Sequence, residues 1–440
     1  MKKEQKQLTN PQKSIWLIEK FFENTSVSNV GGSLLIHEKV NFDLFEKAIN
    51  LFIQKNDGIR LCFTMQGGTP TQYVKEPIYQ KFDIVDINSK EDLQQKEKEF
   101  IQIPFSLFDS FLFTFRILKL KDGSGGFYIT THHLISDAWS MSLLVDEIID
   151  IYSSLLKNEF ISDVNYPSYF EYIETEKKYF LSDKFKKDET YWNGLFSSCP
   201  SCVSFSQKNP KNSSPIAKRK AFFLENSNSI FAFCKQYDIS PFTFLMAVYA
   251  IYLYRITGNE EVVLGSPILN RNGVKEKSIF GLFINTLPIK IELKDGLVFT
   301  DLIKNISQNQ FSMFRHHKYP YPKLLETLRE KYQFSNSLYD TIISYQNARN
   351  NSQSSDIPYS TNWDFNGYCS NSLDIHIYDL DNNGVLQLYY DYRLDKFEES
   401  EIEDIHSRIL YIIEQILNNP NLAVHELEIV TPAEKQLLVH

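Results

Sequence analysis

Two adjacent histidines and an aspartate four residues further on are the residues of this sequence best suited to acid–base chemistry. They are His132, His133 and Asp137. An imidazole has an ordinary pKa near 6.5, so at neutral pH it can accept and return a proton as a general base must. An aspartate near such a base commonly orients it or holds the loop that carries it. A histidine pair alone can also be incidental, and both interpretations remain open at this point.

A metal site is the weaker hypothesis for these residues. Neighbouring side chains of a strand point to opposite faces, so His132 and His133 cannot easily chelate one ion, and we expect only one of them to contact substrate. We expect His316 and His317 on a solvated turn rather than as further ligands. The stretch Cys199-Pro-Ser-Cys202 has CxxC spacing but no second cysteine pair, which favours two loop thiols. The sequence predicts no bound metal or cofactor.

Other catalytic signatures are missing from the sequence. There is no GxSxG elbow, no glycine-rich phosphate loop and no convincing pair of carboxylates. Acid–base or orienting chemistry remains, without a covalent nucleophile. Arg271 is interpreted either as an exposed turn residue or as a buried partner of Asp137.

The elements around the histidines are a strand and a helix. From Phe127 aromatic and β-branched residues alternate as in a strand, whereas after Ala138 apolar residues recur at helical spacing. The preceding run Phe111–Leu120 and a glycine-rich turn predict a hairpin with this strand. The two histidines are therefore expected to end the strand, and Asp137 to open the helix.

The rest of the chain alternates predicted helices and strands, which indicates an α+β fold. A helix is expected after Asn10, as N-cap, with Pro11 in its first turn. The polar stretch Ser197–Pro215 is typical of a linker or exposed crossover. The second half repeats the α+β rhythm and is expected to end in a helix at Glu401–Leu417.

Length and charge limit the classes of function. The 440 residues suffice for two or three domains. The net charge of -9 argues against a nucleic-acid partner, because binding phosphates needs a basic face. No secretion signal and no run of about 20 apolar residues is present, so we expect a cytoplasmic protein without membrane contact.

Seven sequence blocks, taken together, resemble the condensation domain of nonribosomal peptide synthetases over nearly the whole chain. The stretch His132-His133-Leu-Ile-Ser-Asp137-Ala138 is similar to that family's HHxxxDG signature. Six further blocks occur in the family's order: Leu8-Thr-Asn-Pro-Gln-Lys-Ser-Ile-Trp16, Asn56-Asp-Gly-Ile-Arg60, Tyr191-Trp192, Gly265 to Arg271, Gly281 to Leu287, and His317-Lys-Tyr-Pro320. Each block is weak alone, but the ordered set is specific.

The resemblance implies two chloramphenicol-acetyltransferase-like lobes, which we place at residues 1–176 and 177–440. They would form a V-shaped pseudo-dimer with a central tunnel that meets the signature midway. Donor and acceptor would enter from opposite faces on phosphopantetheine arms.

The resemblance also assigns roles to residues. His133 would lie at the reaction centre as base or as a group that positions the amine, and His132 would support the loop. Asp137 and Arg271 would form a structural salt bridge. The remaining expected tunnel residues are Ala138, Ser140 and Asn285. Ala138 replaces the family's glycine, and its methyl group would narrow the acceptor side or exclude a positive φ.

The first block also resembles starter condensation domains, which N-acylate the first amino acid of a lipopeptide. The expected donor is a fatty acyl thioester on coenzyme A or an acyl carrier protein, and the acceptor is an aminoacyl group on a downstream peptidyl carrier protein. The end of the chain, from Leu427, is similar to the linker into an adenylation domain, and the domain is expected to be monomeric. The order Trp139-Ser140 argues against an epimerisation domain, and the retained histidines argue against a heterocyclising one.

Three alternatives remain. The chain could form peptide bonds with an upstream aminoacyl or peptidyl carrier. It could be a non-catalytic docking platform for carrier proteins, an idea motivated by Ala138. His132 and Asp137 also match the HxxxxD of glycerolipid acyltransferases, although that class normally works at membranes.

Overall fold

The computed structural model describes residues 4–162, 166–199, 201–208, 213–333, 337–346, 356–379 and 384–438. The chain forms two compact units, and each has its own sheet and hydrophobic core. The first unit combines Met1–Asp183, Leu269–Ile284 and Ala348–Gly367. The second combines Lys184–Ile268, Asn285–Asn347 and Tyr368–His440. Sheets with helices on their faces confirm the α+β class, whereas the lobe limits 1–176 and 177–440 stay a prediction.

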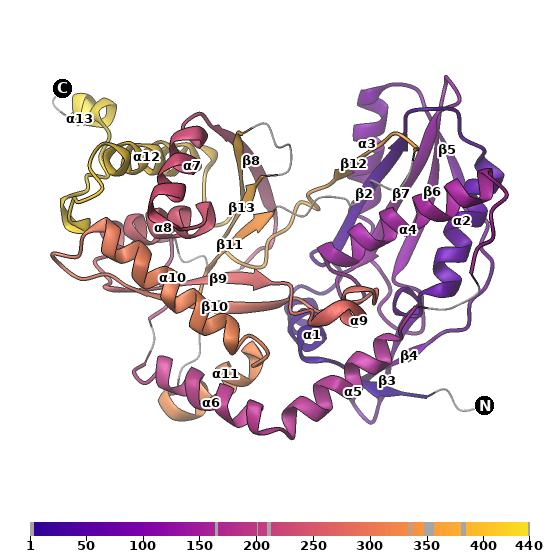
Figure 1. Cartoon of the computed structure of the whole chain (residues 1–440), viewed down its shortest axis with the longest axis horizontal. Helices are drawn as coiled ribbons and strands as arrows, with labels where there is room; N and C mark the ends of the chain where they lie inside the picture. The colour runs from indigo at the N-terminus through magenta and orange to yellow at the C-terminus, as the bar shows by residue number, and fades with distance from the viewer. Residues whose placement is uncertain are drawn as a thin grey trace. The chain divides into compact units, whose positions relative to one another are not determined.

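The first unit is built around a five-stranded sheet in the order β12-β2-β7-β6-β5 (Figure 1). Its strands are β12 (Tyr359–Trp363), β2 (Asn29–Ile36), β7 (Gly125–His132), β6 (Phe113–Leu120) and β5 (Asp83–Ile87). All neighbours are antiparallel except β5 and β6, and β6 and β7 form the predicted hairpin. The helices α2 (Phe42–Lys55) and α4 (Ala138–Leu156) cover one face, and α3 (Lys90–Ile101) covers the other.

A smaller sheet of three strands, in the order β1-β4-β3, also belongs to the first unit. Its strands are β1 (Lys6–Gln7), β4 (Thr69–Val74) and β3 (Leu61–Gln66), and the remaining helical elements of the unit are α1 (Asn10–Phe21), η1 (Gly58–Arg60), α5 (Tyr169–Phe180) and α9 (Gly273–Lys277). The predicted N-cap of α1 was wrong by one residue. The cap is Thr9, because Thr9 and Gln12 bond each other's backbone N–H groups in a capping box.

The second unit has a six-stranded sheet in the order β10-β9-β11-β13-β14-β8. Its strands are β10 (Asn285–Glu292), β9 (Glu261–Ile268), β11 (Thr341–Gln346), β13 (Leu373–Tyr378), β14 (Leu386–Arg393) and β8 (Ala217–Leu224). Only β11 pairs in parallel, with β9 and β13. The helices α7 (Ser227–Tyr237), α8 (Pro241–Thr257) and α12 (Glu399–Asn418) pack together (Figure 1).

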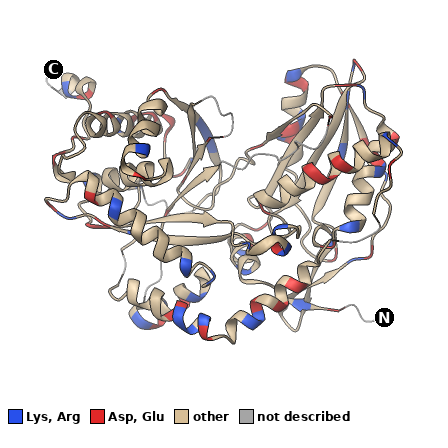
Figure 2. Cartoon of the chain, in the orientation of Figure 1, with Lys and Arg blue, Asp and Glu red and all other residues tan. Residues whose placement is uncertain are grey.

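The other helical elements lie at the ends of this chain order: α6 (Asp183–Leu195), α10 (Phe299–Arg315), α11 (Tyr321–Tyr332), η2 (Val424–Glu426) and α13 (Pro432–Leu438). The expectation that Glu401–Leu417 is the last helix was wrong, because α13 follows it. Lys, Arg, Asp and Glu alternate along α5 and α6 (Figure 2). Within the described ranges no single helix has the length and apolarity to cross a membrane, although α7 and α8 pass that test as a pair bent by 104°.

Candidate functional site

Asp137 is the N-cap of α4, as predicted. Its Oδ1 accepts hydrogen bonds from the backbone N–H and from the hydroxyl of Ser140, each at 2.9 Å. A side-chain oxygen at this position satisfies one of the free donors of the first helical turn, so it fixes where the helix begins. The turn that joins β7 to α4 is therefore held by its own aspartate.

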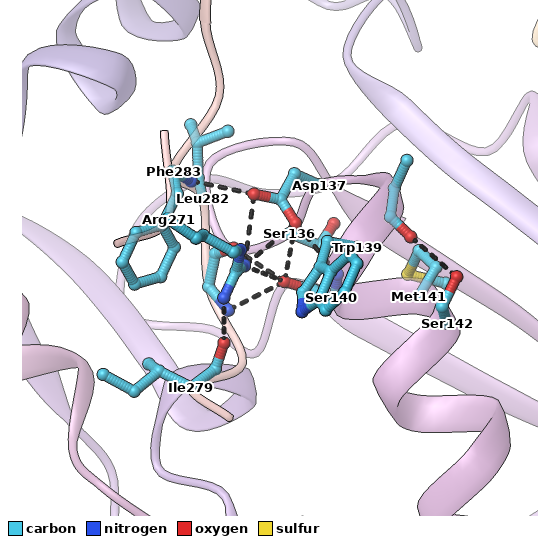
Figure 3. Close-up of polar contacts among 12 residues, drawn as sticks. Ser136, Asp137, Trp139, Ser140, Met141, Ser142, Arg271, Ile279, Leu282 and Phe283 are labelled. Carbon is cyan, nitrogen blue, oxygen red and sulfur yellow. Dashed lines mark hydrogen bonds and ion pairs between the residues drawn. The ribbon is translucent and has the colours of Figure 1, made fainter. Parts of the chain in front are cut away.

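A buried ion pair joins Asp137 to Arg271 (Figure 3). Arg271 Nη2 lies 3.0 Å from Oδ1 and 3.2 Å from Oδ2, and both side chains are 0% exposed. The backbone N–H of Phe283 donates to Oδ2 at 2.9 Å. The expected salt bridge is thus present, and additional donors compensate the loss of water around the carboxylate.

Arg271 also holds the segment that follows it in sequence. Its Nη1 donates to the carbonyls of Glu276 at 2.7 Å and Ile279 at 2.5 Å, and its Nη2 donates to the carbonyl of Gly281 at 2.8 Å. The guanidinium lies 3.9 Å from the ring centre of Phe283, in cation–π range. One side chain therefore fastens residues 271–283 to the start of α4.

Gly281 is required by close packing. A side chain there would overlap the ring of Tyr169, whose hydroxyl donates to the carbonyl of Leu282 at 2.7 Å. The sequence identified Gly281 only as part of a motif block, without this reason.

The three expected tunnel residues lie in different surroundings. Ser140 is fully buried, and its hydroxyl is 2.9 Å from Arg271 Nη2 and 2.7 Å from the carbonyl of Gly281, so it belongs to the ion-pair network. Asn285 lies in the second unit, where its amide donates to the carbonyls of His317 and Tyr319. Ala138 is exposed, and a glycine is not needed there because its φ is that of the first residue of a right-handed helix.

His133 keeps one ring nitrogen for chemistry. Its Nδ1 lies 2.7 Å from the carbonyl of Ser136, which can only accept, so Nδ1 carries the proton and Nε2 the lone pair. No hydrogen bond from the described part of the chain reaches Nε2. Burial lowers the pKa of His133 from its ordinary value, so the ring is neutral at pH 7. The ring is half-buried, and its backbone N–H donates to the carbonyl of Ser28.

His132 points elsewhere and is 2% exposed. Its Nδ1 accepts the backbone N–H of Leu134 at 3.1 Å, so the proton of the neutral ring is on Nε2, 3.2 Å from Glu19 Oε1. The edge of the ring meets Phe105. The two histidines thus face different surroundings and carry opposite tautomers, which confirms the expected divergence. Sequence reasoning missed Glu19, because no local signal connects α1 with the end of β7.

His316 does not lie on a solvated turn, so that expectation was wrong. It is half-buried, its Nδ1 lies 2.6 Å from Asp188 Oδ1, and its ring stacks on Tyr191 at 4.1 Å. The carbonyl of His316 accepts the indole N–H of Trp192 at 3.0 Å. His317 is also half-buried. Across the described ranges, no three His, Cys, Asp or Glu side chains gather as a metal site would require.

Relatives of the chain are parts of multidomain synthetases. The family model "Condensation domain" matches residues 2–439. Surfactin synthase subunit 1 of Bacillus subtilis (strain 168) is 32% identical over 443 residues, which cover 98% of this chain and 12% of that protein. A plipastatin synthase of the same organism is 30% identical, with 98% and 17% covered. The chain therefore spans about an eighth to a sixth of these relatives.

Solved structures share the fold. The starter condensation domain of rhizomide synthetase RzmA, in a mutant form bound to C8-CoA, has a TM-score of 0.85 at 20% identity, covering 96% of this chain and 97% of that one. The first condensation domain of the calcium-dependent antibiotic synthetase, bound to a substrate analogue, has a TM-score of 0.84 at 17% identity, with 97% and 99% covered. The family match spans nearly every residue, so the chain belongs to the condensation domain family of nonribosomal peptide synthetases.

Proposed function

We propose that this chain is a starter condensation domain. It joins a fatty acyl group, delivered as a thioester of coenzyme A or of an acyl carrier protein, to the amine of an aminoacyl group on a peptidyl carrier protein. The observation that carries the proposal is the free Nε2 of a neutral His133 at the end of β7. The fold shared with a starter domain bound to C8-CoA supports the choice of donor.

The reaction needs one proton acceptor. The amine nitrogen attacks the thioester carbonyl, the C–N bond forms, and the C–S bond breaks with its electron pair leaving on sulfur. His133 Nε2 accepts the proton that the amine loses and returns it to the thiolate, while Nδ1–H stays bonded to the carbonyl of Ser136. Acyl transfer to an amine involves no change of oxidation state, so the proposed reaction needs no redox cofactor.

The surrounding residues position this imidazole. The Asp137–Arg271 pair fixes the turn, and the ring of His132 caps the backbone N–H of Leu134 immediately after His133. The proposed partners are the donor thioester, a downstream peptidyl carrier protein and an adenylation domain. The idea of a non-catalytic platform loses its motive, because Ala138 fits the helical backbone without strain.

Mass spectrometry of the acceptor carrier tests the proposal. The carrier is loaded with an amino acid, mixed with the domain and offered acyl-CoAs of eight to sixteen carbons or an upstream aminoacyl carrier. We expect N-acyl aminoacyl products, and their loss in His133→Ala but not in His376→Ala, which alters a histidine of the second unit. Condensation from the aminoacyl carrier alone would show a peptide-bond-forming domain. Carrier binding without any condensation would show a docking platform, and acylation of glycerol phosphate a lipid acyltransferase.

A further inference from the structure

A second cavity, of about 690 Å³, lies in the first unit on the face of the sheet that α3 covers. It is bounded by α3, by β2 and β12, and by the end of β6. Its walls are largely apolar, and it has the size of a typical small-molecule site. The side chains of Leu35, Ile87, Leu93 and Leu120 form the apolar part.

One wall of this cavity carries a buried carboxylate, Glu97 of α3, which is 3% exposed. Oε1 accepts the hydroxyl of Ser33 at 2.5 Å, and Oε2 lies 3.4 Å from the amide nitrogen of Asn362. Both partners are neutral, and within the described ranges no Lys, Arg or His forms an ion pair with this carboxylate. Burial, with Asp364 nearby, raises the pKa of Glu97 to about 6, so the carboxylate is charged at pH 7.

A buried anion without a cation is unfavourable, and its stabilisation needs a countercharge with hydrogen-bond donors. An ammonium group supplies one positive charge and up to three donors. A neutral ligand supplies no charge, and an anionic one repels Glu97 and Asp364. The apolar walls between Glu97 and the exposed mouth, where Lys90, Lys121 and Asp122 lie, fit a hydrocarbon body.

We propose that this cavity is a second ligand site of the domain, which binds a primary amine carried on an apolar body with its ammonium group against Glu97. The site is separate from the turn that carries His133, because α3 and α4 lie on opposite faces of the sheet. It does not depend on the amide-forming reaction.

The site is closed on one side by the late segment of the chain. Asn362 comes from β12, which pairs with β2 at the edge of the sheet. Gly32 permits this approach, because a Cβ atom there would overlap the backbone and ring of β12 residues Asn362 and Trp363. The close fit of β12 places a hydrogen-bond donor beside the carboxylate.

Three probes with the same eight-carbon chain separate charge from apolarity: octylamine, 1-octanol and octanoate. Calorimetry at pH 7.5 compares the whole chain with Glu97→Gln and with Glu99→Gln, a control on the exposed side of the same helix. We expect octylamine to bind about tenfold or more tightly than 1-octanol, an advantage that Glu97→Gln removes and Glu99→Gln keeps.

Equal affinity for octylamine and 1-octanol, or equal behaviour of the two variants, would overturn the proposal. Circular dichroism and the urea midpoint of Glu97→Gln check that the variant folds. Saturating octanoyl-CoA serves as a competitor. Octylamine that is displaced by it would lie in the thioester site, which would contradict a separate amine site, whereas undisturbed binding supports one even if no amide product forms.

Discussion

Each unit contains a buried aspartate bonded to an arginine, and the two pairs differ in what they hold. In the first unit, Asp137 and Arg271 are both 0% exposed and connect a helix start to a distant loop. In the second, Arg219 bonds both oxygens of Asp391 at 2.6 and 2.7 Å across neighbouring strands, and its side chain is 24% exposed. The first pair fixes irregular backbone, whereas the second joins strands that backbone hydrogen bonds already hold.

The histidines near the two pairs show the consequence. Both ring nitrogens of His376 are engaged, Nδ1 with Ser344 at 2.7 Å and Nε2 with Asp391 at 3.1 Å. His133 has only one engaged nitrogen, because Asp137 is committed to the helix start and to Arg271. The same residue types therefore produce a closed network on a sheet and an open proton acceptor at a turn.

The largest expected effect is that of Arg271→Ala on stability. It leaves Asp137 as a fully buried charge without a cation, which costs about 3–5 kcal/mol of unfolding free energy. Urea unfolding followed by fluorescence measures the loss. An effect no larger than that of Arg219→Ala would remove the distinction between the two pairs.

His133→Ala is expected to slow amide formation by about 10²–10⁴-fold, because it removes the proposed proton acceptor. His376→Ala is the matched variant, and we expect its rate to stay within about threefold of the wild type, since its network is structural. Single-turnover assays with a loaded carrier measure both. Similar losses in the two variants would contradict an exclusive role of the first unit's histidine.

The pH dependence follows from the lowered pKa of His133. The folded chain holds this proton less tightly than the unfolded chain, whose pKa is near 6.5, so His133 lowers stability as pH falls below about 6.5. A titration of the ring Cε1 proton by NMR, assigned with His133→Ala, should give a midpoint below 6.5. A midpoint at or above 6.5 would show that water reaches the ring freely.

Arg219→Ala is expected to destabilise the second unit by about 1–2 kcal/mol. Asp391 keeps its contact with His376, and water can reach the partly exposed place of the lost guanidinium. The urea midpoint, compared with that of Arg271→Ala, measures this smaller effect. A loss of 3 kcal/mol or more would make the two pairs equivalent.

The smallest expected effect is that of Ala138→Gly. Because Ala138 is exposed and helical, the change should cost less than about 1 kcal/mol and alter the rate of amide formation by less than about twofold. The same two assays measure it. A tenfold faster reaction would show instead that the methyl group obstructs the acceptor.

Local patterns were sufficient to predict the centre of the site. The change from alternating to helical periodicity at Asp137 correctly placed the end of β7 and the start of α4. The buried pairing of Asp137 with Arg271 followed from the family resemblance, because spacing alone left Arg271 open. Elements with a clear apolar stripe, such as α2 and α8, were also found.

The missed features depend on long-range contacts. β12 is a short polar edge strand, and it is recognisable only by its pairing with β2, which lies far earlier in the chain. The helix α3 has few apolar residues in its sequence Lys-Glu-Asp-Leu-Gln-Gln-Lys-Glu-Lys-Glu-Phe-Ile. His316 is buried by Asp188, which lies 128 residues away. Tertiary packing, rather than local propensity, decides such residues.

The scattered composition of the first unit has a consequence for synthesis on the ribosome. Arg271 is translated 134 residues after Asp137, and β12 later still. At roughly 5–20 residues per second, Asp137 waits about 7–27 s for its cation. During that interval the signature turn lacks the side chain that fastens it, so the earliest part of the chain completes its fold only after much of the second unit has emerged.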